Sequence, residues 1–170
     1  MKECYSIKLK PGAIPFAITS PRRVLNQTKA ELERMAEEKV ITPVLKPTEW
    51  YAPVVIVPKS DGNVRICVDL IELINKNVIR ELHPLPKAEY SLHLLVGAKN
   101  FSKLDANSGF WQIPLDKKSS YLSTFITPFG RFRCQRLPFG ISSAPEHFQR
   151  SMSQMLEGIP GTQFVTWMIF

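Results

Sequence analysis

The sequence predicts an α+β fold in which short helices accompany antiparallel hairpins. Two observations point to this class. Runs of β-branched and aromatic residues occur in pairs that are joined by a short turn, at 54–68 and at 121–137. Two other segments, at 28–40 and 143–156, open on helix-capping residues and continue with apolar side chains at helical spacing.

The first 26 residues are expected to form an extended lead-in, because prolines at 11, 15 and 21 do not suit a helix. We expect this lead-in to lie across the body of the domain. The sequence TKAE at 28–31 is a capping box, in which Thr28 would cap a helix and Glu31 would reach back to it. Apolar residues that share one helical face follow, which predicts a helix over about 29–39.

Two hairpins are predicted from their strands and turns. The first joins strands at 54–57 and 64–68 through the turn KSDGN, which gives it a basic tip. The second joins strands at 121–127 and 131–137 through Pro-Phe-Gly, with arginines on or near it. Both should contribute antiparallel pairs to the domain.

The secondary structure of the remaining segments is predicted with unequal clarity. Residues 69–80 favour neither a helix nor a strand, whereas apolar spacing predicts a helix over 87–96. A further helix is expected to begin at Ser143, with a proline in its first turn, and to stop at Gly158. Residues 162–170 are predicted to be a final strand.

Composition limits the function classes. The 22 basic and 15 acidic residues give a net charge of +7 and a pI near 9.5, which favours a polyanionic partner such as nucleic acid or an acidic membrane surface. No stretch approaches the ~20 apolar residues of a spanning helix, and the N-terminus has no secretory pattern, so we expect an intracellular location, cytoplasmic or nuclear. Three widely spaced cysteines indicate neither a disulfide framework nor a zinc site.

One carboxylate is a candidate for metal chemistry. In FSKLDANSGFWQIPL, residues 101–115, Asp105 ends an apolar-flanked run and precedes small turn-forming residues and two aromatics. A carboxylate at such a position suits a hard cation such as magnesium. On spacing alone the alternative is a strand, an Asx-type turn and a second strand, with Asp105 serving the turn.

Several motifs occur together and in order: VPKSDGNVRICVD at 57–69, HPLP at 83–86, FSKLDANSGFWQIPL at 101–115, and TFITPFGRFRCQRLPFGISSAPEHFQR at 124–150. This set resembles the reverse transcriptase domain of the Pol polyprotein of gypsy-type long-terminal-repeat retrotransposons. The resemblance implies the fingers and the first part of the palm of a right-hand polymerase, truncated before the second catalytic hairpin. Residues 27–96 would be the fingers-like region and 97–170 the partial palm-like region.

The resemblance also implies roles for individual residues in nucleotidyl transfer by an RNA-directed DNA polymerase. Asp105 would be a catalytic carboxylate and a ligand for two magnesium ions. The substrate-binding residues would be Lys59 and Arg65 at the triphosphate, Ala106 beside Asp105, Phe110 beneath the sugar, and Phe139 and Gly140 near the nascent base pair. The implied partners are an RNA or DNA template-primer and a deoxynucleoside triphosphate.

The chain departs from the family at its end. The family has two adjacent aspartates that complete the metal site, whereas this sequence has no acid after Glu157. We therefore expect an inactive fragment, and a frameshift near 162–163 would explain the loss. Two alternatives stay open: a non-enzymatic nucleic-acid-binding module, and a polymerase that is active only when completed by recoding or by a partner chain.

A second departure lies in DLIELINK at 69–76. By the resemblance, Ile71 replaces a template-contacting arginine and Ile74 is an inserted residue. One extra residue turns the downstream face of an α-helix by about 100°. We therefore expect a weakened grip on the template in this region.

Overall fold

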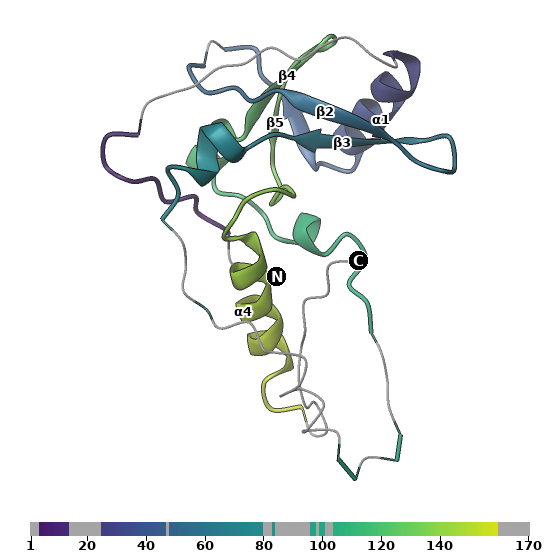
Figure 1. Ribbon diagram of the computed structural model, residues 1–170, viewed down its shortest axis with the longest axis vertical. Helices are drawn as coiled ribbons and strands as arrows, with labels where there is room; N and C mark the ends of the chain where they lie inside the picture. Colours follow the sequence, from purple (N-terminus) through teal and green to yellow (C-terminus); the bar gives the residue numbers. More distant parts are fainter. Residues whose placement is uncertain are drawn as a thin grey trace.

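Two antiparallel sheets and helix α1 form the upper part of the molecule in Figure 1, and helix α4 extends below them. This is a computed structural model, and it describes residues 4–13, 25–46, 48–79, 83, 96–97, 99–100 and 104–159. The elements are α1 (Leu25–Glu37), β1 (Ile41–Pro43), β2 (Val54–Pro58), β3 (Val64–Val68), the π-turn η1 (Ile71–Asn75), the 3₁₀ turn η2 (Gly109–Gln112), α3 (Lys117–Leu122), β4 (Thr124–Thr127), β5 (Gly130–Cys134) and α4 (Ala144–Leu156).

The larger sheet has three antiparallel strands in the order β1-β5-β4. Its β4–β5 hairpin confirms the prediction of two strands around Pro-Phe-Gly, although each strand is shorter than expected. The hydroxyl of Thr127 accepts a hydrogen bond from the amide of Phe129 at 3.1 Å and donates one to the carbonyl of Gly130 at 2.9 Å. These bonds close the turn and fix the register of the hairpin.

Residues 121–122, predicted as strand, belong instead to helix α3. The carboxylate of Asp116 accepts hydrogen bonds from the amides of Lys118 at 2.8 Å and Ser119 at 3.0 Å. An acidic N-cap of this kind satisfies amides that a helix start leaves unpaired. The local cap therefore prevails over the β-forming residues that follow it.

The smaller sheet is the predicted β2–β3 hairpin, in which Val57 pairs with Arg65 and Val54 with Val68. Val54 and Val64 are buried, whereas Val55 and Val57 are exposed. Ala52, just before β2, exchanges backbone hydrogen bonds of 2.8 and 3.1 Å with Thr124 and Ile126 of β4. The chain thus connects the two sheets immediately before the hairpin.

Helix α1 confirms the predicted first helix but not its cap. It begins at Leu25, so Thr28 lies within the helix, where it is 1% exposed. The inward position of Thr28 explains the failure, because its side chain packs in the interior instead of facing the helix start. At the other end Lys39 has a φ of 56°, and the amide of Val40 donates to the carbonyl of Met35 at 2.9 Å, which is a left-handed helix stop.

The lead-in crosses the body of the domain, as predicted, over the part that is described. The amide of Tyr5 donates to the carbonyl of Pro114 at 2.8 Å, and the amide of Ile7 donates to the hydroxyl of Ser119 at 2.7 Å. Further along, the carbonyl of Lys8 accepts from the amide of Ile79 at 2.7 Å. Residues 4–10 therefore connect the segment before α3 with the segment after η1.

The core lies between the two sheets, α1 and the start of α4. Its most deeply buried large side chains include Phe125, Ile41, Leu32, Ile113 and Leu137. Within the described ranges, no helix is long and apolar enough to cross a membrane.

Three expectations fall wholly or partly outside the described residues: most of the helix over 87–96, the strand over 162–170 and the shifted reading frame near 162–163. Residues 69–80, which specified no element from sequence, contain the π-turn η1. In a π-turn the amide bonds to a carbonyl five residues back, so the turn takes up one residue more than an α-turn. The expected rotation of the downstream face assumed an α-helix, whereas these residues form a π-turn, and the weakened grip on the template stays a prediction.

Candidate nucleic-acid and nucleotide site

The tip of the β2–β3 hairpin presents two cations to solvent. Lys59 and Arg65 are both exposed, and neither forms an ion pair with a described carboxylate. The carboxylate of Asp61 accepts hydrogen bonds from the amide of Asn63 at 3.0 Å and from its side chain at 3.1 Å. These bonds, the backbone one first, lower the pKa of Asp61. The turn is thus held by its own residues, which leaves both cations available to a ligand.

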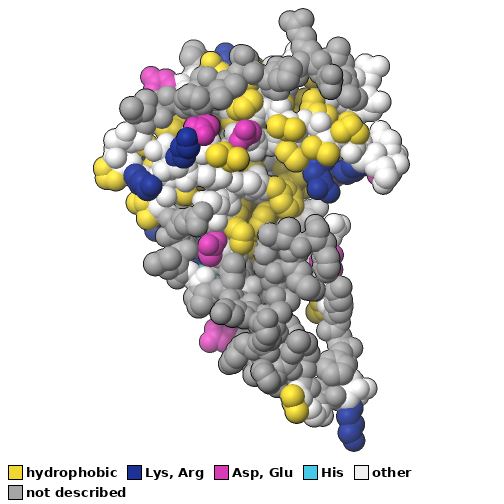
Figure 2. All heavy atoms as spheres, viewed as in Figure 1, with side chains coloured by type: hydrophobic (Ala, Val, Ile, Leu, Met, Phe, Trp, Pro, Cys, Tyr) yellow, Lys and Arg dark blue, Asp and Glu magenta, His cyan; other side chains and the backbone are white. Residues whose placement is uncertain are grey.

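Figure 2 shows how this surface is composed: Lys and Arg side chains border a yellow area of hydrophobic side chains near the hairpin. The exposed apolar residues of this part include Val55 at 52% and Val57 at 44%. Cations exposed in this way suit the phosphates of a nucleic acid.

Asp105 is exposed and lies in irregular chain before η2. Its carboxylate accepts no hydrogen bond from a described residue. The turn that follows is held by other groups: the side-chain amide of Gln112 donates to the carbonyl of Asn107 at 2.9 Å, and the amide of Trp111 donates to the carbonyl of Ser108 at 2.8 Å. The Asx-turn alternative is therefore wrong for the described residues, and the carboxylate is free to meet a ligand.

The described residues do not fit a two-metal centre. No group of three or more His, Cys, Asp or Glu side chains that could hold a metal ion occurs among them. Magnesium held by a single exposed carboxylate keeps most of its water and binds weakly. The described residues thus lack the clustered carboxylates that a catalytic pair of ions requires.

Aromatic side chains that follow Asp105 in the chain pack against a second segment. Phe110 is 4% exposed, and its ring centroid lies 5.0 Å from that of Phe139 and 5.6 Å from that of Phe148. Phe139 is 52% exposed and also contacts Trp111 at 6.4 Å. The structure therefore brings the predicted residues Phe110 and Phe139 together, with Phe110 beneath and Phe139 facing solvent.

Ala106 and Gly109 explain why this packing is tight. A Cβ atom on Gly109 would lie 2.9 Å from the ring of Phe148 and 3.5 Å from Cβ of Ala106. A contact under 3.0 Å is not tolerated without movement, so a side chain at position 109 would require the ring of Phe148 to shift. Ala106 itself is half-buried beside Asp105, as the sequence placed it.

Gly140 lies where the backbone of its loop approaches strand β3. Its φ is 95°, and a Cβ atom there would lie 3.5 Å from the carbonyl oxygen of Val68. The positive φ is what favours glycine here. The loop from Phe139 to Ser142 therefore reaches the end of β3, although its residues are about 70 positions later in the chain.

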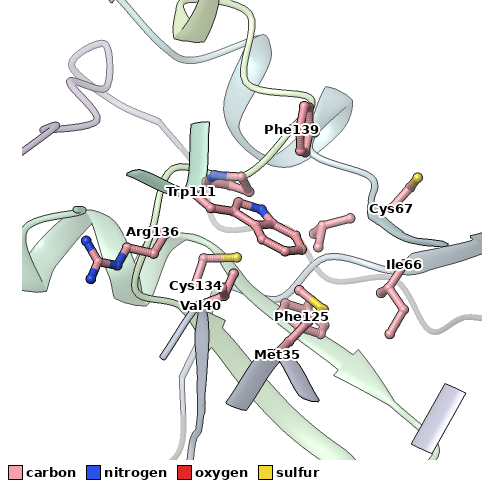
Figure 3. A pocket seen from close by; sticks show the side chains of 11 residues that line it. Met35, Val40, Ile66, Cys67, Trp111, Phe125, Cys134, Arg136 and Phe139 are labelled. Carbon is pink, nitrogen blue, oxygen red and sulfur yellow. The ribbon is translucent and has the colours of Figure 1, made fainter. Parts of the chain in front are cut away.

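The cavity between β3 and this loop is a packing defect and not a nucleotide pocket. Figure 3 shows it, with Trp111 and Phe139 on one side and Met35 and Phe125 on the other; the guanidinium of Arg136 points away from it. Its volume is about 30 Å³, which is room for water alone. An open groove of about 480 Å³ lies beside it, lined by Glu38, Asn107, Ser108, Gln112 and Arg136 together with Trp111 and Val40.

Sequence reasoning missed two residues that support this site. The guanidinium of Arg34 lies 5.7 Å from the centre of the Trp111 ring and is held by Glu31 and Glu38. The hydrogen bonds that Arg34 donates to Glu31, and then those to Glu38, raise the pKa of Arg34. The second residue, Asn75, bonds to the loop that carries Phe139. Neither contact has a signal in the local sequence, because each joins segments that are far apart in the chain.

Comparison with known proteins agrees with this arrangement. Residues 57–168 match the family model described as "Reverse transcriptase (RNA-dependent DNA polymerase)". The chain is 34% identical over 155 residues to the "Retrovirus-related Pol polyprotein from transposon 412" of Drosophila melanogaster. The aligned residues cover 88% of this chain and 12% of that protein. It is 32% identical over 155 residues to the "Enzymatic polyprotein" of Cauliflower mosaic virus (strain NY8153), covering 88% of this chain and 22% of that protein. The chain thus spans less than a quarter of these relatives.

Solved structures show the same fold. The prototype foamy virus protease-reverse transcriptase superposes with a TM-score of 0.80 at 24% identity, covering 92% of this chain and 21% of that one. The foamy viral enzyme in complex with an RNA/DNA hybrid superposes with a TM-score of 0.71 at 21% identity, over 93% of this chain and 21% of that one. The fold is therefore a part of the reverse transcriptase fold. On the family match and the identity to Pol polyproteins, the chain belongs to the reverse transcriptase family.

Proposed function

We propose that the chain supplies the fingers and the first part of the palm of a gypsy-type retrotransposon reverse transcriptase. Residues 27–96 would form the fingers-like region and 97–170 the partial palm-like region, with the lead-in lying across both. Within this proposal the chain binds an RNA or DNA template-primer inside the cell. The order of the motifs and the packing of Phe139 against Phe110 support the assignment.

The observation that carries the proposal is the pairing of a cationic hairpin with a supported aromatic loop. Lys59 and Arg65 are exposed without an ion pair to a described residue, and Phe139 is half-exposed on a packed aromatic base. Cations neutralise phosphates, whereas an exposed ring stacks on a base or a sugar. The net charge of +7 supports the same polyanionic partner.

We also propose that these 170 residues do not polymerise DNA on their own. Nucleotidyl transfer of the kind that the resemblance implies depends on clustered carboxylates, and the described residues contain no group of three or more side chains that could hold a metal ion. The sequence has no acid after Glu157, so residues 158–170 add none. Binding would therefore survive in this chain without catalysis.

The experiment is a gel-shift titration of the chain with an RNA/DNA hybrid that has a template overhang, run alongside primer extension with magnesium and all four nucleotides. We expect binding that falls steeply with salt and no extension. The matched variants are Lys59→Gln and Arg65→Gln, each expected to reduce the salt slope by about 0.9 for the phosphate contact that it removes. Lys46→Gln, at an exposed position away from the hairpin, is the control for net charge.

Two results would overturn the proposal. Absence of hybrid binding at low salt would remove the nucleic-acid function altogether. Extension by the chain alone would show that the catalytic carboxylates are present after all. Extension that appears only after a partner chain is added would instead favour the alternative of a completed polymerase.

A further inference from the structure

Asn75 holds the loop that carries Phe139 at two points. Its side-chain Nδ2 donates a hydrogen bond to the carbonyl of Gly140 at 2.7 Å, and its Oδ1 accepts one from the amide of Ser142 at 2.8 Å. A single amide group thus bonds to two backbone groups of a loop that is 65 to 67 residues away in the chain. Both the donor and the acceptor of the amide are needed for this contact.

Few other hydrogen bonds support the loop, although Ile141 within it is buried in the core at 2% exposure. Before it, the amide of Leu137 donates to the carbonyl of Ile113 at 2.9 Å, and after it the amide of Ala144 donates to the carbonyl of Ile141 at 3.1 Å. Between these bonds, no other described side chain forms a hydrogen bond to the loop backbone. Gly140 moreover has a left-handed backbone conformation, with φ 95°, so the loop has unusual conformational freedom where Asn75 holds it.

The π-turn η1 is what places Asn75 on this loop. The carbonyl of Leu70 accepts from the amides of both Ile74 and Asn75, each at 2.9 Å. The bond to Asn75 spans five residues, which is one more than an α-turn spans. Because of this extra residue, Leu73 and Ile74 are both fully buried, at 1% and 0%, while Asn75 remains beside the loop.

We propose that Asn75 is a positioning residue for nucleic-acid recognition: the π-turn presents its amide as a two-point clamp that keeps Phe139 against Phe110 and Trp111. The inference rests on the proposed function, because the ligand that Phe139 meets is the template-primer. Asn75 itself acts through the loop and not by contact with the ligand. Loss of the clamp displaces Phe139 without removing any cation from the surface.

The first test uses Asn75→Asp, which keeps the shape of the side chain but replaces its amide donor, Nδ2, with a carboxyl oxygen. The ionised carboxylate still accepts from Ser142 but repels the carbonyl of Gly140, whereas the protonated carboxyl can donate to that carbonyl again. The clamp of this variant is therefore complete only while the new carboxyl is protonated, and it loses the bond to Gly140 when the carboxyl ionises.

Trp111 reports the position of Phe139, since the two rings are in contact. In a background that lacks the other tryptophans (Trp50→Phe, Trp167→Phe), emission is followed between pH 3.5 and 7.5. We expect Asn75→Asp to resemble the parent at low pH and to depart from it as the pH rises. The control is Asn77→Asp, whose parent side chain forms no hydrogen bond to a described residue, and it should follow the parent throughout. Identical profiles for Asn75→Asp and the parent would overturn the clamp.

The second test measures affinity for the RNA/DNA hybrid at pH 7. We expect Asn75→Asp to bind roughly tenfold more weakly, the order expected for a lost hydrogen bond, with an unchanged salt slope because no phosphate contact is removed. Far-UV circular dichroism checks the fold, and Asn75→Ser, which is uncharged and too short to reach both partners, replaces the aspartate variant if that one unfolds.

The outcomes distinguish the role of Asn75 from the proposed function of the chain. A moved Trp111 signal with parental affinity would overturn the role of Asn75 in recognition while leaving the proposed function intact. A parent chain that does not bind the hybrid would overturn the proposed function, and with it the recognition role of Asn75. The pH profile of Trp111 would still decide whether the clamp exists.

Discussion

The loop at 139–142 and the turn at 105–108 are built differently. Two hydrogen bonds from Asn75 hold the loop, and Phe139 lies on the ring of Phe110. Asp105, at the start of the turn, is exposed and accepts no hydrogen bond from a described residue. The part that would contact template and base is thus complete within the described residues, whereas the part that would bind metal is a single carboxylate. Stability and binding should therefore depend on the first region far more than on the second.

The largest effect is expected from Phe110→Ala. Removing a buried aromatic side chain costs about 3 kcal/mol or more in the free energy of unfolding, because a cavity is left behind. Phe139→Ala, at a half-exposed ring on the same cluster, should cost about 1 kcal/mol. Urea denaturation of both variants measures the difference. Equal losses of unfolding free energy would mean that Phe139 is as much a core residue as Phe110. The distinction between a buried supporting ring and an exposed ring would then be wrong.

A smaller effect is expected at the N-cap of α3. Asp116→Ala should cost about 1 kcal/mol at neutral pH, because two helix amides lose their acceptor. The pKa of Asp116 is lowered: burial raises it, but hydrogen bonds from Ser119, Ser6 and Lys118 together outweigh burial. The cap therefore contributes its full stability above about pH 3.9 and loses it as the pH falls through the lower folded-state value.

The measurement is the melting temperature of parent and Asp116→Ala between pH 2 and 7. Their difference should be constant near neutrality and should shrink in acid, where the parent loses its cap. Glu49→Ala is the matched control, since its exposed side chain forms no hydrogen bond or ion pair with a described residue. A difference that persists unchanged at pH 2 would contradict the cap.

The smallest effect on stability is expected from Asp105→Asn, within about 0.5 kcal/mol of the parent, because an exposed side chain without a described partner contributes little. The melting temperature of each protein should be the same in magnesium-free buffer and in about 10 mM magnesium. That concentration exceeds the dissociation constant of about 10⁻³ M of a weak cation site. Marked stabilisation of the parent alone by magnesium would show that Asp105 belongs to a more complete metal site than the described residues provide.

The hairpins and the long helices were predictable because their signals are local. The valine-rich strands with KSDGN between them, and the apolar stripe that follows Thr28, specify β2–β3 and α1 with small errors at their ends. The motif around Asp105 was predictable by resemblance, and its neighbours Phe110 and Phe139 do come together. Local pattern and family motif therefore give the elements and most of the candidate site.

The errors have a different origin. Thr28 lies inside α1 because burial decides its position, and residues 121–122 are helical because the cap at Asp116 outweighs strand propensity. The π-turn depends on burying both Leu73 and Ile74, which no short pattern reveals. Asn75 joins segments 65 residues apart, and such a contact exists only once the chain has folded. Tertiary packing, not sequence periodicity, decides each of these.

The proposal that the chain binds a hybrid but holds no complete metal site is tested most directly by counting bound manganese with electron paramagnetic resonance. The chain is titrated with Mn²⁺ with and without the RNA/DNA hybrid, in parallel with Asp105→Asn. We predict that the chain binds the hybrid but holds no protein-dependent Mn²⁺ more tightly than about 1 mM. Two Mn²⁺ ions bound well below that concentration, and lost in Asp105→Asn, would contradict the account.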